Sequence, residues 1–379
     1  MRCRSLFASL LAGAATLAFV SGPALAQGVT AAGSGVTTIA VIGDTPYGAD
    51  QSSSTAFPNL VNAVNADPSV SMTVHLGDIK NGSTVCSDPY FDKIKGWFNN
   101  FDDPLVYTPG DNEWTDCHRT NNGSFNPLER LARIRQVFFP IAGQPTVGTR
   151  NLETQASQPG SETFKENNRW QDCQSVFATV HVVGSNNGRQ PWTGQSGVTP
   201  EQQAEVDART AAANSWINQA FDRATAINAP GVVLMMQADM WDASAGVSGL
   251  SGFDSIVATI ANRSVSFAKP VLILQGDSHS YKVDNPYTDP TEASLHPAPT
   301  TVPTNVTRVV VQGQVTNEYL RLTCNPQAAN PFSFQRVSVA APPPVVPEVP
   351  APVLLPVTAG GLLAGVVLLR RRRRNAGAG

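Results

Sequence analysis

The stretch that decides the fold is Thr37–Tyr47, which reads Thr-Thr-Ile-Ala-Val-Ile-Gly-Asp-Thr-Pro-Tyr. Its run of β-branched and apolar residues is typical of a strand buried on both faces, because both rows of side chains then need apolar character. Gly43 allows the backbone to bend, and Asp44 follows at the carboxyl end of the predicted strand. Pro46 lacks the amide hydrogen of a further ladder bond, so we expect the strand to stop there.

The same pattern, an apolar run that ends in Gly-Asp, occurs three more times, at Thr73–Asp78, Leu105–Asp111 and Val271–Asp277. One Gly-Asp pair indicates only a turn. Four at strand ends would gather four carboxylates along one edge of a sheet, where open α/β folds bind their ligands. Folding does not need the repulsion between these charges, so a bound cation is the expected reason for it.

Composition limits the classes of protein that remain. The chain has 379 residues, 41% of them hydrophobic, which suffices for one large domain or two small ones. The formal net charge is −3 with 15% charged residues, so the sequence gives no sign of a basic nucleic-acid-binding surface. The 30 glycines and 29 prolines predict a loop-rich molecule.

The first 26 residues have the pattern of a secretory signal peptide. Arg2 and Arg4 precede the apolar run Leu6–Val20, and Ala24-Leu25-Ala26 offers small residues for cleavage. A transmembrane helix is the alternative interpretation. After export, Cys86, Cys117, Cys173 and Cys324 would remain in an oxidising compartment, which predicts two disulfides with three possible pairings. We favour Cys86–Cys117 with Cys173–Cys324, because Cys86 and Cys117 each follow a strand end at the same predicted sheet edge.

The carboxyl end has a second targeting pattern. Residues 340–350 form a proline-rich spacer, and residues 351–374 comprise an apolar helix and an arginine cluster. The apolar run Val353–Leu369, about 25 Å long as a helix, is marginal for spanning a bilayer. With Pro347-Glu348-Val349-Pro350 before it, this segment resembles the PEP-CTERM sorting signal of bacterial envelope proteins, from which it departs by the inserted Val349. The resemblance implies removal of the helix during export; a permanent tail anchor is the alternative.

Between these ends, residues 36–338 alternate between strand and helix patterns, which favours an α/β fold. Capping residues followed by proline predict helices that start at Asp88, Asn126 and Thr199, with a shorter helix at Pro58–Val64. Further strands are predicted at Ser175–Val183 and Gly231–Met236. Two more, at Val306–Gln312 and Tyr319–Thr323, are expected to form a closing hairpin.

The strand ends resemble the calcineurin-like metallophosphoesterases. That family carries Asp-x-His, Gly-Asp, Gly-Asn-His-Glu/Asp, a lone His and Gly-His-x-His, in this order. The matching stretches are Gly43-Asp44-Thr45-Pro46, Gly77-Asp78, Gly110-Asp111-Asn112-Glu113, Gln237 and Gly276-Asp277-Ser278-His279. The resemblance implies a four-layer αββα sandwich of two mixed sheets flanked by helices. It implies two divalent metal ions held by Asp44, Asp78, Asp111, Gln237, Asp277 and His279.

The chain departs from the family's pattern at several ligands. Pro46 replaces a histidine, and Gln237, Asp111 and Asp277 put oxygen donors at positions that include imidazoles in the family. Oxygen donors favour Mg, Mn or Ca over Zn in the second site, and the ions proposed for the two sites are drawn from Mn, Mg, Ca, Fe and Zn. The resemblance implies that Asp78 bridges the ions, about 3.5–4 Å apart, with a hydroxide between them as nucleophile.

Protonation of the leaving group is the step that the departures affect most. Asn112 replaces the histidine that assists catalysis in the family, and an amide cannot act as a general acid. His118 or Glu113 in the same loop is a possible substitute, or the substrates have leaving groups that need no proton. Without an acid, the expected loss in rate is about 10²–10⁴-fold.

Several residues have structural alternatives. Gln237 could be a buried amide bonded to the backbone, and Tyr47 could either replace the lost histidine or pack as an aromatic. His75 and His181 lie within apolar strands and are expected to be hydrogen-bonded core residues. His296 lies among prolines and is expected to be solvent-exposed.

Two functions follow from these patterns. The first is an exported metal-dependent phosphoesterase that acts on small phosphate mono- or diesters. The alternative is an envelope binding or structural protein that keeps the fold with a weakened or inactive site. Either would reach the periplasm, cell surface or extracellular matrix, with the sorting machinery as a partner and with membrane contact through the C-terminal helix.

Overall fold

The computed structural model describes residues 35–47, 55–314 and 317–339. The predicted signal peptide, proline-rich spacer and C-terminal helix with its arginine cluster lie outside the described residues. Within the described ranges, no helix is long and apolar enough to cross a membrane.

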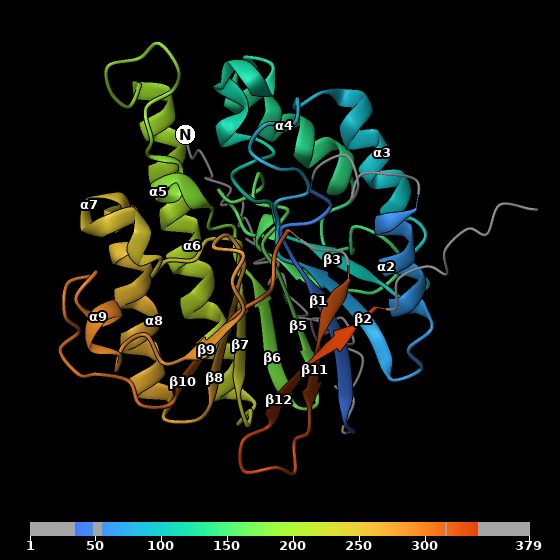
Figure 1. Cartoon of the computed structure of the whole chain (residues 1–379). Helices are drawn as coiled ribbons and strands as arrows, with labels where there is room; N and C mark the ends of the chain where they lie inside the picture. Colours follow the sequence, from blue (N-terminus) through green and yellow to red (C-terminus); the bar gives the residue numbers. More distant parts are fainter. Residues whose placement is uncertain (1–34, 48–54, 315–316, 340–379) are drawn as a thin grey trace, which may run out of the picture. The chain divides into compact units, whose positions relative to one another are not determined.

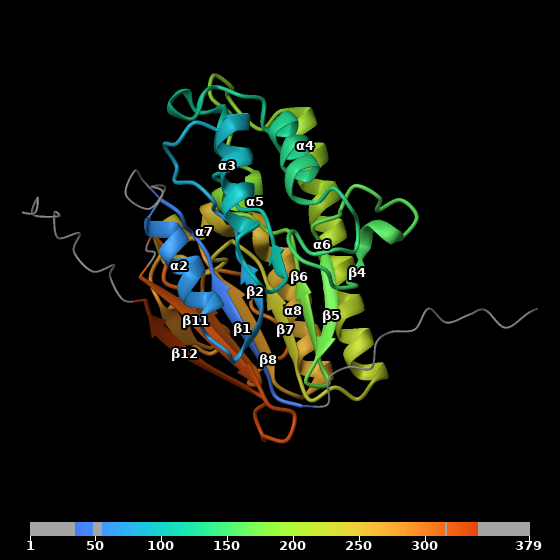
Figure 2. The ribbon, with the colours of Figure 1, turned by 90° about the vertical axis from the view of Figure 1, so that its right-hand side faces the viewer.

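Two mixed β-sheets form the centre of the molecule (Figures 1 and 2). The five-stranded sheet has the order β12 (Phe332–Ser338), β11 (Glu318–Cys324), β1 (Thr37–Ile42), β2 (Val70–His75), β3 (Leu105–Tyr107). The seven-stranded sheet has the order β4 (Glu153–Thr154), β5 (Asn168–Asp172), β6 (Ser175–Thr179), β7 (Val232–Met235), β8 (Val271–Gln275), β10 (Val306–Val310), β9 (Lys282–Asp284). Strands β1, β2 and β3 are parallel, as are β6, β7, β8 and β10, so their carboxyl ends lie along one edge of each sheet.

Helices cover the outer face of each sheet. The helices of the described ranges are α2 (Ala56–Asn65), α3 (Asp88–Phe98), α4 (Pro127–Phe138), α5 (Gly184–Gly188), α6 (Pro200–Ala226), α7 (Gly246–Leu250), α8 (Asp254–Phe267) and α9 (Pro290–Ala293). Short 3₁₀ helices are η1 (Thr115–His118), η2 (Thr120–Asn122), η3 (Gln155–Ser157), η4 (Ala243–Ala245) and η5 (Ser251–Phe253). Figure 1 shows α6 and α8 on one side of the strands and α2 and α3 on the other.

Three apolar clusters bind these layers together. One fills the space between the sheets and includes Val41 and Val74 from one sheet with Phe177 and Leu272 from the other. A second joins α2, α3 and α4 to the five-stranded sheet, and a third joins α6 and α8 to the seven-stranded sheet. The order helix, sheet, sheet, helix confirms the predicted four-layer sandwich. It follows from strands that are apolar on both faces.

Two of the three predicted N-cap residues are confirmed, and the third cap lies one residue earlier than predicted. Asn126 and Thr199 accept hydrogen bonds from backbone amides in the first turns of α4 and α6. For α3 the cap is Ser87, which accepts from Tyr90 N, and Asp88 is already helical. The predicted cap at Asp88 was therefore wrong by one residue, since a serine in extended conformation serves equally well.

The predicted closing hairpin is wrong. Strand β10 pairs in parallel with β8 in the seven-stranded sheet, whereas β11 pairs with β1 in the other sheet. The hairpin that does form joins β11 to β12, a strand that the sequence analysis did not identify. Alternation of apolar residues indicates a strand but does not say which sheet the strand joins, and β12 alternates weakly because it lies at an edge.

Both predicted disulfides are present. Cys86–Cys117 connects the loop after β2 to η1, and Cys173–Cys324 connects the β5–β6 turn to the end of β11. The second bridge therefore ties one sheet to the other. The prediction for His296 was wrong, because its ring is buried and contacts Asp254 Oδ1 at 2.8 Å and Met240 O at 2.7 Å.

Candidate metal centre

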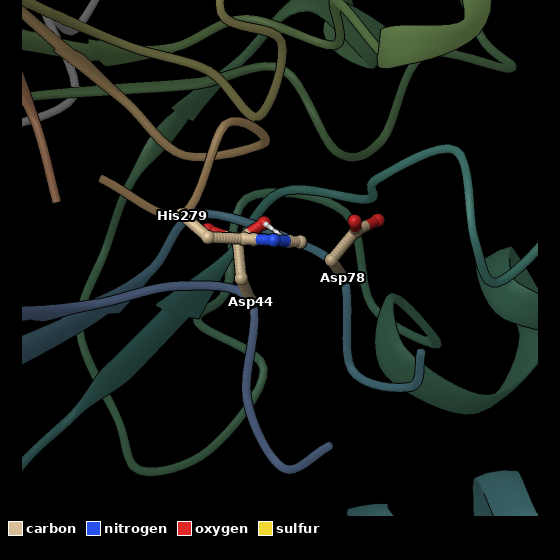
Figure 3. A group of neighbouring side chains, drawn as sticks. All are labelled: Asp44, Asp78 and His279. Atoms are coloured by element: carbon tan, nitrogen blue, oxygen red, sulfur yellow. Dashed lines mark ion pairs between the residues drawn. The ribbon is translucent and has the colours of Figure 1, made fainter. Parts of the chain in front are cut away.

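Strand ends from both sheets meet at one place. Asp44, Asp78 and Asp111 follow strands of the five-stranded sheet, and Asp277 and His279 follow β8 of the seven-stranded sheet. Two groups result, Asp44 with Asp78 and His279, and Asp78 with Asp111 and Asp277. Within each group the ligand atoms lie within 4.8 Å of one another, and Asp78 belongs to both. Figure 3 shows the first group, with the His279 ring beside Asp44.

The backbone at these residues has an unusual conformation. Asp44, Asp78, Asp277 and His279 have φ values of 50°, 57°, 71° and 61°, in the left-handed region that non-glycine residues seldom adopt. Such conformations persist only where surrounding contacts hold them, and they gather at functional sites. The torsions turn the side chains sharply out of the strand direction and toward one another.

Two glycines let the carboxylates lie directly over neighbouring backbone. A Cβ added to Gly276 would lie 2.5 Å from Asp44 Oδ2, and one added to Gly110 would collide with Asp78 Oδ1. Any side chain at either position would push a carboxylate out of the centre. Gly110 and Gly276 are therefore needed for the close approach of these carboxylates.

Electrostatics favour a bound cation. Asp44 and Asp78 are 0% and 1% exposed. Burial raises the pKa of Asp44, Asp78 and Asp277 well above the ordinary aspartate value, and the negative charge of Asp111 raises each further. Burial also lowers the pKa of His279, which keeps the imidazole neutral and able to bind a metal.

Two buried atoms in the first group lack a hydrogen-bond partner, Asp44 Oδ2 and His279 Nε2. His279 Nε2 lies 3.7 Å from Asp44 Oδ1, and its other ring nitrogen contacts the Gln314 side-chain amide at 2.7 Å. Unpaired buried donors and acceptors are rare unless a ligand uses them. These residues therefore fit a divalent cation: mixed oxygen and nitrogen donors in the first group, oxygen only in the second.

Asn112 and Tyr47 form a hydrogen-bonded set around the shared carboxylate. Asn112 Nδ2 donates to Asp78 Oδ2 at 2.6 Å and to Tyr47 OH at 2.9 Å, and Tyr47 OH donates to Asp78 Oδ2 at 2.7 Å. Tyr47 also lies edge-on to His279, with ring centroids 5.3 Å apart. Tyr47 and Asn112 are thus both part of the centre.

Glu113 and His118 occupy different surroundings. Glu113 is fully buried, and its Oε1 accepts from Asp78 N, Gly110 N and Tyr107 OH at 3.1, 2.6 and 2.5 Å. It therefore fixes the backbone on which Asp78 stands. His118 is half-buried, and its Nδ1 accepts from Thr193 N at 2.8 Å. The catalytic roles of Asn112, Glu113 and His118 stay predictions.

Gln237 lies at the centre as a buried amide that is hydrogen-bonded to the backbone, which was the structural alternative to a metal ligand. Its Oε1 accepts from Gly184 N at 2.7 Å, and its Nε2 donates to Asp111 Oδ1 at 3.3 Å. Gln237 thus orients Asp111, and its role as a metal ligand stays a prediction. His75 and His181 are buried and hydrogen-bonded, as expected, to Thr45 O and Glu166 respectively.

Two residues near Asp111, Ser185 and Asp116, were not predicted from the sequence. Ser185 Oγ lies 2.8 Å from Asp111 Oδ2 and 3.0 Å from Asp116 Oδ1. Burial raises the pKa of Asp116 to about 7, while the Arg119 guanidinium 2.7 Å away opposes the shift. Ser185 directly follows Gly184 at the end of the predicted strand Ser175–Val183. The Gly-Asp pattern requires a carboxylate after the glycine, so it did not select this serine.

Residues 37–281 match the family described as calcineurin-like phosphoesterases. The chain belongs to this family. None of the curated proteins compared with the chain matches it. The family match supports metal-dependent hydrolysis at the level of the family. This is in keeping with the candidate ligands that converge in the structure, Asp44, Asp78, Asp111, Asp277 and His279.

Three solved structures are similar to this chain. A dimetal phosphatase from Danio rerio is 10% identical with a TM-score of 0.45, over 81% of this chain and 100% of that one. A candidate 5′-nucleotidase from Staphylococcus aureus is 12% identical with a TM-score of 0.42, over 81% of this chain and 55% of that one. A purple acid phosphatase from yellow lupin (Lupinus luteus) seeds is 11% identical with a TM-score of 0.41, over 80% and 54%. The chain spans about half the length of the latter two.

Proposed function

We propose that the protein is an exported phosphoesterase that requires two divalent metal ions and hydrolyses small phosphate mono- or diesters. The observation that carries the proposal is the pair of buried ligand groups that share Asp78. Ionised carboxylates buried this close repel one another strongly unless a cation lies between them. The family match supports the reaction class.

Bound divalent ions supply Lewis-acid stabilisation of the phosphoryl group and an activated water. The chain's own residues would hold the ions and orient the phosphoryl group. Asp78 is common to both groups, and Asn112 Nδ2 is placed to donate to a phosphoryl oxygen once it releases Asp78. The oxygen-only group of Asp78, Asp111 and Asp277 favours Mg, Mn or Ca over Zn.

The substrates proposed are esters whose leaving groups need little protonation. Asn112 cannot donate a proton to an alkoxide. Glu113 is fully buried and is held through Oε1 by three hydrogen bonds, and His118 uses one ring nitrogen for Thr193. Aryl esters and other esters of acidic alcohols therefore suit this centre best.

Export is proposed from the signal-peptide pattern of Met1–Ala26 and is supported by the two disulfides, since disulfides persist in oxidising compartments. Delivery to the cell surface or matrix follows from the PEP-CTERM-like segment. The replacement of ligand histidines by Pro46 and Gln237 favours the second candidate function, a binding or structural protein whose centre holds a cation without turnover.

One experiment separates the two functions. The purified protein is stripped of metal and assayed with an aryl phosphate and an aryl phosphodiester after addition of Mg, Mn, Ca or Zn. Turnover that a divalent ion restores, and that Asp78→Asn abolishes, is expected for the enzyme. Thermal stabilisation by a metal without turnover of either substrate would favour the binding protein.

A further inference from the structure

A buried ion network lies beside the metal centre. Arg308 of β10 is fully buried and contacts three carboxylates: Asp239 at 2.8 Å, Asp284 at 2.5 Å and Glu292 at 2.6 Å. The guanidinium also lies 5.5 Å from the ring centroid of Trp241. A guanidinium stays charged at any pH that the protein tolerates, so this network is a permanent feature of the fold.

Asp239 connects this network to the metal-ligand loop. One carboxylate oxygen, Oδ1, accepts from Arg308, and the other, Oδ2, accepts from Ser278 Oγ at 2.8 Å. The backbone amide of Asp239 also donates to Asp277 Oδ2, at 3.3 Å. Asp239 thus contacts two consecutive residues of the loop, one of which is a candidate ligand.

Ser278 stands between Asp277 and His279, which belong to different ligand groups. Both neighbours have left-handed backbone torsions, so the loop needs support from outside itself. The same strand that carries Arg308 leads to Gln312, whose Nε2 donates to His279 O at 2.6 Å. The loop is therefore held from two sides by β10 and the residues after it.

We propose that Arg308, Asp239 and Ser278 form a positioning chain that sets the metal affinity of both ligand groups through Asp277 and His279. The inference rests on the proposed metal-binding function. Arg308 fixes Asp239, Asp239 fixes the Ser278 hydroxyl, and the hydroxyl holds the loop that presents the two ligands. Outer hydrogen-bond partners of metal ligands typically change affinity about 10–100-fold.

Ser278→Ala tests the positioning chain and leaves the ion pairs of Arg308 in place, because Ser278 is partly exposed and its substitution removes one hydrogen bond. Mn²⁺ affinity of the metal-free protein is measured by titration calorimetry, and unfolding temperature by scanning calorimetry. We expect Mn²⁺ to bind at least about tenfold more weakly, with the metal-free unfolding temperature unchanged. Ser278→Thr keeps the hydroxyl and is expected to retain the wild-type affinity.

Ser266→Ala is the matched control, since Ser266 on α8 is exposed and bonds only to Asn262 O at 2.9 Å. Asp239→Asn is expected to weaken Mn²⁺ binding as well. The double variant with Ser278→Ala is expected to have the same Mn²⁺ affinity as the single variant that binds less tightly, because both substitutions break the same link between Asp239 and Ser278. Wild-type affinity in Ser278→Ala would overturn this inference alone. A wild-type protein that binds no divalent ion would overturn the proposed function and this inference together.

Discussion

Asn112 Nδ2 lies 2.6 Å from Oδ2 of Asp78, the carboxylate that belongs to both ligand groups. In the family pattern a histidine stands at this position, where it can give up a proton. The amide instead donates a hydrogen bond to this candidate metal ligand. In the proposed reaction, leaving-group protonation therefore has no donor at this position.

The first prediction concerns leaving groups. Reactivity should fall steeply as the leaving-group pKa rises, so that aryl esters exceed alkyl esters by about 10²–10⁴-fold more than in an enzyme with a general acid. The measurement is the slope of log kcat/KM against leaving-group pKa. Asn112→Ala should lower the rates and keep the slope. A shallow slope that steepens in His118→Ala would instead make His118 the acid.

The second prediction concerns Asp78→Asn. The substitution removes a charge from both ligand groups, so metal affinity should fall by more than the about 10–100-fold that follows loss of an outer hydrogen-bond partner. Metal content after dialysis and turnover of an aryl phosphate measure the effect. Asp102→Asn, at an exposed aspartate, is the control. Retention of two bound ions in Asp78→Asn would contradict the shared-ligand arrangement.

The third prediction is that metal binding releases protons. The raised pKa values of Asp44, Asp78 and Asp277 mean that the metal-free folded state holds protons that the unfolded state has lost. For these groups, stability is fully present below the ordinary aspartate pKa of about 3.9 and is lost as pH rises toward the folded values. Metal affinity should change in the opposite sense and rise with pH.

Titration calorimetry of Mn²⁺ binding in buffers with different ionisation enthalpies measures this release. The observed enthalpy should vary linearly with buffer ionisation enthalpy, with a positive number of protons released. An enthalpy that is the same in every buffer would mean that the carboxylates are already ionised without metal.

The fourth prediction compares the disulfides. Cys173–Cys324 joins residues 151 apart and Cys86–Cys117 joins residues 31 apart. In the chain-entropy description, removal of the first costs about 5 kcal/mol and of the second about 4 kcal/mol. Denaturant unfolding of the two double Cys→Ala variants measures both. Equal midpoints, or a larger loss for Cys86–Cys117, would mean that local contacts outweigh loop entropy.

The fifth prediction assigns Glu113 a positioning role. Glu113→Ala leaves Asp78 N, Gly110 N and Tyr107 OH without their buried acceptor, at about 1–3 kcal/mol each. The free energy of unfolding should therefore fall by at least about 3 kcal/mol. Glu113→Gln keeps an acceptor oxygen and should lose less. A Glu113→Gln variant with native stability and no turnover would instead favour the acid role.

Sequence patterns predicted the parts of this molecule that depend on neighbouring residues. Apolar runs that end in Gly-Asp indicated where strands end. Because parallel strands bring their carboxyl ends to one edge, Asp44, Asp78, Asp111 and Asp277 were predicted to lie close together. Contacts between distant segments were harder. The sheet to which β10 belongs depends on pairing with β8, and nothing local to Val306–Val310 specifies that partner.

The same reason explains the other misses. His296 is buried because Asp254 and Met240 come to it from other segments, although its own neighbours are prolines. Ser185 meets Asp111 and Asp116 only after the chain has folded. Side chains whose roles arise from tertiary contacts leave no periodic signal, because periodicity records one element's exposure and not its partners.

The candidate ligands come from two sheets, so a bound ion would connect the sheets mechanically. Asp44, Asp78 and Asp111 move with the five-stranded sheet, and Asp277 and His279 move with the seven-stranded sheet. An ion held between them is a cross-link that resists sliding of one sheet over the other. Loading with metal should accordingly raise the force at which the two halves of the sandwich shear apart.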